Sequence, residues 1–62
     1  MGSCEALRDT CMKTWNDDFI CGHLYSRCLN STELFLNAYL CYISRDYEEC
    51  MVQVIREATG HG

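Results

Sequence analysis

The six cysteines constrain this chain more than any other feature, because only 62 residues carry them. A chain this short buries about 60% of the surface that its unfolded form exposes, so its apolar core alone gives little stability. Cysteine at roughly a tenth of the residues of a small chain is typical of a disulfide scaffold. The even count permits complete pairing, so the sequence predicts three disulfides in a single domain over residues 1–62.

The sequence also predicts that this domain is entirely helical. It has no proline and only four glycines, and its apolar residues recur at steps of three and four. Residues that can cap helices divide the pattern: Ser3, the run 16–18, Asn30 with Glu33, and Asp46 with Glu49. We therefore expect a small disulfide-stapled bundle of three to four short helices, with a hairpin of helices about 4–15 and 17–29 and further helices about 31–43 and 46–58.

Two parts of the chain allow other interpretations. Residues 52–54 could begin a strand, although no partner strand is visible. Residues 1–3 and 59–62 are expected to be flexible ends or additions to a mature domain.

The spacing of the first four cysteines predicts how they pair. Cys4 and Cys11 are seven residues apart, almost two helical turns, and so are Cys21 and Cys28. Each pair therefore points the same way from its helix. If the two helices fold back near Asn16, Cys4 lies opposite Cys28 and Cys11 lies opposite Cys21. This geometry predicts nested bridges Cys4–Cys28 and Cys11–Cys21.

Cys41 and Cys50 obey a different constraint. In an unbroken helix they would lie about 13.5 Å apart along the axis and on opposite faces, whereas a disulfide needs Cα atoms within about 7 Å. They can pair only if the helix breaks, and residues 44–46 are the predicted break. The alternative is one long helix whose cysteines bond to the hairpin, for example through Cys21–Cys41 and Cys11–Cys50.

Charge and cysteine content limit the classes of partner and the compartment. The net charge of −4 gives no basic patch for nucleic acid or for an anionic membrane surface. The most apolar run, residues 34–43, is about half the length of a membrane span. Three disulfides favour an oxidising compartment, and Asn30-Ser31-Thr32 is an N-glycosylation acceptor pattern. We therefore expect a secreted glycoprotein, with no nucleic-acid partner and no membrane span.

No pattern in the sequence predicts catalysis or a cofactor. His23 follows Cys21 by two residues, but no C-x2-C knuckle or second paired histidine completes a zinc site. A cysteine nucleophile would need an unpaired thiol, and the chain is too short to enclose a typical ligand pocket. We expect a protein that is not an enzyme, with no catalytic residue, no metal and no cofactor.

The predicted third helix, residues 31–43, is apolar almost all the way round. Its apolar residues form three rows: Leu34, Ala38 and Cys41; Phe35, Tyr39 and Tyr42; and Leu36, Leu40 and Ile43. A small domain cannot easily bury all three, so either the helix is central or one row is a contact surface. Aromatic residues are enriched at binding hot spots, which makes Phe35, Tyr39 and Tyr42 the predicted binding surface. The alternative is that they belong to the core.

Parts of the cysteine pattern resemble known families. The opening segment Ser-Cys-Glu-Ala-Leu-Arg-Asp-Thr-Cys has the C-x6-C gap seen at the start of small acidic helical ciliate pheromones and in the helical modules of glial growth-factor receptors. Nested bridges between antiparallel helices are similar to those of mitochondrial intermembrane-space proteins. Those proteins use twin C-x9-C pairs, whereas here nine residues separate Cys11 from Cys21 across a turn. Each resemblance covers only part of the chain, so we assign no family.

The sequence therefore predicts a secreted helical miniprotein that acts by binding another protein, such as a receptor or the ectodomain of a membrane protein. It could serve as a diffusible signal such as a pheromone or hormone, as a toxin-like effector, or as a receptor-binding module, and self-association is a further expectation. The alternative is a disulfide-stabilised structural or assembly factor of an oxidising organelle space, such as the mitochondrial intermembrane space.

Overall fold

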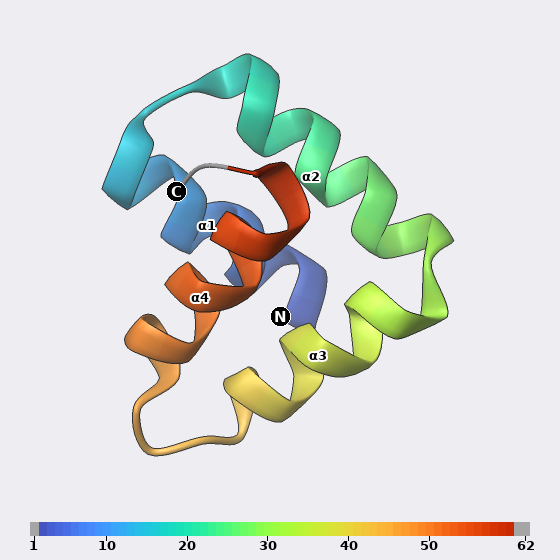
Figure 1. The fold of residues 1–62 in the computed structure, drawn as a ribbon, viewed down its shortest axis with the longest axis vertical. Coiled ribbons are helices and arrows are strands. Elements are labelled where there is room, and N and C mark those ends of the chain that lie inside the picture. Colours follow the sequence, from blue (N-terminus) through green and yellow to red (C-terminus); the bar gives the residue numbers. More distant parts are fainter. Residues whose placement is uncertain (1, 61–62) are drawn as a thin grey trace.

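The protein is an all-α, disulfide-stapled bundle, as its sequence predicts (Figure 1). A computed structural model describes residues 2–60, and no strand occurs in that range. Residues 52–54 belong to a helix, so the strand alternative is wrong. The four helices are α1 (Ser3–Trp15), α2 (Asp18–Asn30), α3 (Thr32–Tyr42) and α4 (Tyr47–Thr59).

The turn between α1 and α2 forms where the polar run 16–18 predicts it. Asn16 adopts a left-handed conformation, with φ of 52°, and its N–H donates to the carbonyl oxygen of Met12 at 2.9 Å. This closes the last turn of α1. The Asp17 carboxylate then accepts the N–H of Ile20 at 3.1 Å and caps α2. Three consecutive polar residues thus end one helix and begin the next.

Two predicted caps are wrong, and a third is correct in position only. Gly2, rather than Ser3, is the N-cap of α1, and Ser3 is already helical and buried. Ser31, rather than Asn30, caps α3, because its hydroxyl accepts the N–H of Leu34 at 3.2 Å. Asn30 instead ends α2, where its amide donates to the carbonyl oxygen of Ser26. Asp46 is the N-cap residue of α4, as predicted, but its side chain makes no cap hydrogen bond, so Asp46 and Glu49 form no capping box.

The core is small and rich in sulfur. Figure 1 shows α2, α3 and α4 around α1, and α1 packs against each of the other three helices. Five of the twelve buried apolar residues are cysteines. The twelve are Cys4, Ala6, Leu7, Cys11, Cys21, Leu24, Cys28, Leu34, Ala38, Cys41, Met51 and Ile55. The disulfides therefore occupy much of the space that large aliphatic side chains fill in a bigger domain.

The three bridges divide the bundle into two stapled hairpins. Cys4–Cys28 and Cys11–Cys21 both join α1 to α2, each with a Cα–Cα distance of 5.7 Å, in the nested arrangement that the spacing predicts. Cys41–Cys50 joins α3 to α4 at 5.3 Å across the break that follows Tyr42. Every cysteine is paired within its own hairpin. The chain joins the two hairpins at Ser31, between α2 and α3, and core packing, the hydrogen bond from Arg27 to Ala58 and the Lys13–Glu48 ion pair also hold them together.

Candidate contact surface on the third helix

The most unusual surface of the molecule lies on the outer side of α3. Six large apolar residues of this helix and its last turn are between 38% and 63% exposed. They are Phe35, Leu36, Tyr39, Leu40, Tyr42 and Ile43, and we call them the apolar α3 face. This face contains the three aromatic residues that the sequence nominates as a binding surface.

The helical repeat explains how these six side chains come to share one face. Only the row Leu34, Ala38 and Cys41 points into the core. At 100° per residue, the other two apolar rows cover a continuous arc on the opposite side of α3. The sequence argument allowed for one exposed row, whereas the structure exposes two. The second exposed row, Leu36, Leu40 and Ile43, doubles the apolar surface that the aromatic row alone would present.

The ends of α3 extend the apolar surface onto neighbouring segments. Near the N-terminal end, Leu29 is 62% exposed and lines an open hollow together with Phe35. Asn30, the glycosylation candidate, is exposed and lines the same hollow. At the other end, the rings of Tyr42 and Tyr47 lie 6.3 Å apart. A glycan on Asn30 would therefore stand at the edge of the apolar α3 face.

No charged side chain interrupts this surface. The run from Leu34 to Ile43 contains no acidic or basic residue, and Asn37 is its one amide. Glu33 lies before the run and Arg45 follows it, and both are exposed. A typical surface helix carries charged residues on its outer face, so the sequence of α3 matches that of a helix covered on all sides.

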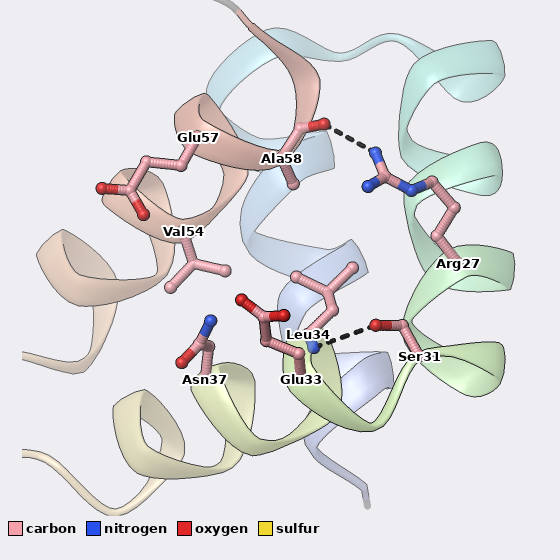
Figure 2. A pocket seen from close by; sticks show the side chains of 8 residues that line it. All are labelled: Arg27, Ser31, Glu33, Leu34, Asn37, Val54, Glu57 and Ala58. Carbon is pink, nitrogen blue, oxygen red and sulfur yellow. Dashed lines mark hydrogen bonds between the residues drawn. The ribbon is translucent and has the colours of Figure 1, made fainter.

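A second surface feature, the hollow between α2, α3 and α4, is polar (Figure 2). It measures about 250 Å³, and Glu33 and Glu57 are among its lining residues. The Arg27 guanidinium in it donates to the carbonyl oxygen of Ala58 at 2.6 Å. Because that carbonyl belongs to the last turn of α4, Arg27 acts as a helix-end partner that fastens α4 to α2.

A polar cluster joins α1 to α2. The Tyr25 hydroxyl donates to a Glu5 carboxylate oxygen at 3.1 Å, and the Arg8 guanidinium lies 4.9 Å from the centre of the Tyr25 ring. Hydrogen bonds from the Glu5 backbone N–H and from Tyr25 lower the pKa of the Glu5 carboxyl. The same bond to a carboxylate raises the pKa of Tyr25. This cluster stabilises the first hairpin.

The other sequence candidates contribute no reactive group. His23 is exposed on α2 and stacks against Phe19, with ring centroids 6.4 Å apart. Within residues 2–60, no three histidine, cysteine, aspartate or glutamate side chains gather as a metal-ligand set. The helices in this range are also too short and too polar to cross a bilayer.

Comparisons with known proteins add no family to this description. Neither the protein-family models, nor the curated proteins, nor the solved structures that were compared with the chain match it.

Proposed function

We propose that this protein is a secreted binding protein that engages another protein through the apolar α3 face. The observation that carries the proposal is the exposure of Phe35, Leu36, Tyr39, Leu40, Tyr42 and Ile43 on one side of a single helix. Leaving such a patch in water forgoes roughly 25 cal/mol for each Å² that a partner could cover. Patches of this kind on small proteins mark interaction sites.

The composition of the face suits recognition by a protein partner. Three of its six residues are aromatic, a type that is enriched at binding hot spots, and the tyrosine hydroxyls can remain at a polar rim. The helix that presents them is held by the Cys41–Cys50 bridge and by its buried row. Binding therefore orders little backbone, and the entropic cost of association stays low. Such a rigid apolar surface suits binding to a receptor or to the ectodomain of another membrane protein.

Secretion is proposed on two grounds. Three disulfides in a chain of 62 residues are compatible with an oxidising, extracellular environment. The acceptor pattern at Asn30 is exposed, at the junction of α2 and α3. A secreted binding domain of this size would serve as a diffusible signal, a toxin-like effector or a receptor-binding module.

The nested bridges of the first hairpin favour a second candidate function. Two antiparallel helices joined by Cys4–Cys28 and Cys11–Cys21 would also suit a structural or assembly factor of an oxidising organelle space. The glycosylation and the location of the natural protein distinguish the two candidate functions. A glycan on Asn30 and recovery from the extracellular medium support secretion, while recovery from an organelle fraction without a glycan supports the second function.

Binding of labelled protein to intact cells of the source organism tests the proposed function. We expect saturable binding that excess unlabelled protein displaces. Tyr39→Ala should weaken it about 10- to 100-fold, the range of a hot-spot truncation. Gln53→Ala, an exposed change on α4, is the matched control and should bind like the wild type. Absence of saturable binding, or equal binding by Tyr39→Ala and the wild type, would contradict the proposal.

A further inference from the structure

The apolar α3 face is large enough to pair with a copy of itself. Six side chains of roughly 200 Å² each, about half exposed, present roughly 600 Å² on each molecule. Two such faces in contact would remove roughly 1,200 Å² from water, the lower end of the range for specific interfaces. A pair that buries this much is expected to be weak but specific.

Five of the six residues of the apolar α3 face lie symmetrically about Tyr39: Phe35 and Ile43 are four positions away, and Leu36 and Tyr42 are three positions away. Leu40 is the exception, because the residue at the matching position, Ala38, is buried. Two helices packed antiparallel about a two-fold axis at Tyr39 bring Phe35 next to Ile43 of the second copy. The same symmetry brings Leu36 next to Tyr42 of the second copy, and Tyr39 next to itself. Every one of these residues is exposed. Such self-matching is what an isologous two-fold interface requires of a single patch.

Charge favours this antiparallel arrangement over the parallel one. Glu33 lies in the first turn of α3, on the side of the hollow toward α4 (Figure 2), and Arg45, the one basic residue between Arg27 and Arg56, follows the last turn of α3. Antiparallel pairing brings the end with Glu33 next to the end with Arg45 of the second copy. Parallel pairing would place like charges together at both ends and would also align the two helix dipoles unfavourably. Between those ends, the face has no charge through which two chains of net charge −4 could repel each other.

We infer that a second copy of this chain covers the apolar α3 face, in a two-fold dimer whose α3 helices are antiparallel and cross near Tyr39. This pairing rests on the proposed function in one respect, since both take the same six residues to be a binding surface. It adds a consequence. The dimer hides the residues that would bind another protein, so self-association and partner binding compete, and the monomer is the form that binds the partner.

Sedimentation equilibrium across a range of protein concentrations tests the dimer directly. The wild type should show a monomer–dimer equilibrium with a dissociation constant in the micromolar range. Tyr39→Glu places two carboxylates at the two-fold axis and should weaken the dimer at least tenfold. Phe19→Glu is the matched control, because Phe19 is 83% exposed on α2, outside the face. A chain that stays monomeric at millimolar concentration overturns the inference, and so does a dimer that Phe19→Glu disrupts and Tyr39→Glu does not.

A charge exchange tests the antiparallel register. At low ionic strength, Glu33→Arg alone and Arg45→Glu alone should each weaken the dimer several-fold, because each places like charges together. The double variant, with both changes, should restore the wild-type dissociation constant. Failure of the double variant to restore it would overturn the antiparallel pairing. Both residues are exposed, so the folded monomer should tolerate these changes, and disulfide mapping can verify its native pairing.

The dimer and the proposed function can fail separately. A chain that stays monomeric, while Tyr39→Ala still loses cell-surface binding, overturns the dimer and leaves the proposed function intact. A chain that dimerises through α3 but shows no saturable binding to cells does the reverse. If both hold, raising the protein concentration above the dimer dissociation constant should lower the fraction of chains able to bind the cells.

Discussion

The two helices of the second hairpin, α3 and α4, differ on their outer sides although they hold similar positions in the bundle. Both pack on α1, and the Cys41–Cys50 bridge joins them. Each buries one narrow stripe, with Leu34, Ala38 and Cys41 on α3 and Met51 and Ile55 on α4. The exposed positions of α4 carry polar residues, namely Glu48, Glu49, Gln53, Arg56 and Glu57, whereas those of α3 carry the apolar α3 face.

This difference shows which apolar residues of a surface helix the fold requires and which it does not. The polar outer side of α4 shows that a helix at the surface of this bundle needs only one apolar stripe. The outer apolar residues of α3 therefore add nothing that the fold demands. They carry a cost in solubility and a risk of aggregation, so their concentration on one helix points to contact with another molecule.

The largest effects should come from removing disulfides, first among them the bridge that joins these two helices. Cys41→Ala combined with Cys50→Ala should lower the free energy of unfolding by about 3 kcal/mol, because the bridge restricts the unfolded chain. Guanidinium denaturation measures the loss. Cys4→Ala combined with Cys28→Ala is the matched comparison. Its sequence separation of 24, against 9, closes a longer loop and should cost slightly more. An unchanged stability without Cys41–Cys50 would mean that packing alone holds α3 against α4.

A second prediction compares the inner and outer sides of α3 by the same chemical change. Leu34→Ala should destabilise the protein by about 2–3 kcal/mol, because Leu34 is 8% exposed and its loss leaves a cavity. Leu40→Ala should change stability by no more than about 0.5 kcal/mol, because Leu40 is 59% exposed. Denaturation midpoints at low protein concentration, where the chain is monomeric, give both values. Equal losses for the two variants would place Leu40 in the core.

The fold follows from the sequence where the signals are periodic and local. Cys4 and Cys11 are seven positions apart, as are Cys21 and Cys28, so each pair lies on one side of its helix, almost two turns apart. Folding the two helices into a hairpin therefore leads directly to nested bridges. Cys41 and Cys50 are nine positions apart and cannot form a disulfide within one unbroken helix. The helix does break between them, since α3 ends at Tyr42. Helix-start residues were predicted less well. Asn30 and Ser31 are both good caps, and the choice depends on which side-chain oxygen can reach the N–H of Leu34.

The candidate surface could be predicted only in part. Three apolar rows on one helix indicate that something must cover it, and the sequence identifies Phe35, Tyr39 and Tyr42 as the aromatic row. How many rows stay exposed depends on where α3 lies in the bundle. That position is set by contacts of Leu34, Ala38 and Cys41 with residues distant in sequence, and periodicity within one helix cannot reveal it. The exposure of Leu36, Leu40 and Ile43 therefore could not be predicted from the sequence of the third helix alone.

The smallest expected effect is a pH-dependent change in melting temperature, which should appear for a variant in the first hairpin and not for a variant on α3. Because the Glu5 pKa is lower in the folded protein than in the unfolded chain, this group stabilises the protein above its unfolded pKa of about 4.3. The stabilisation is lost as the pH falls through the folded pKa. Tyr25→Phe removes one of the hydrogen bonds that lower this pKa. It should melt at a slightly lower temperature than the wild type at pH 6, and the difference should shrink at pH 3. Tyr39→Phe, the same change on the apolar α3 face, should follow the wild type at both pH values. A pH-independent difference for Tyr25→Phe would mean that its hydroxyl acts through packing rather than through Glu5.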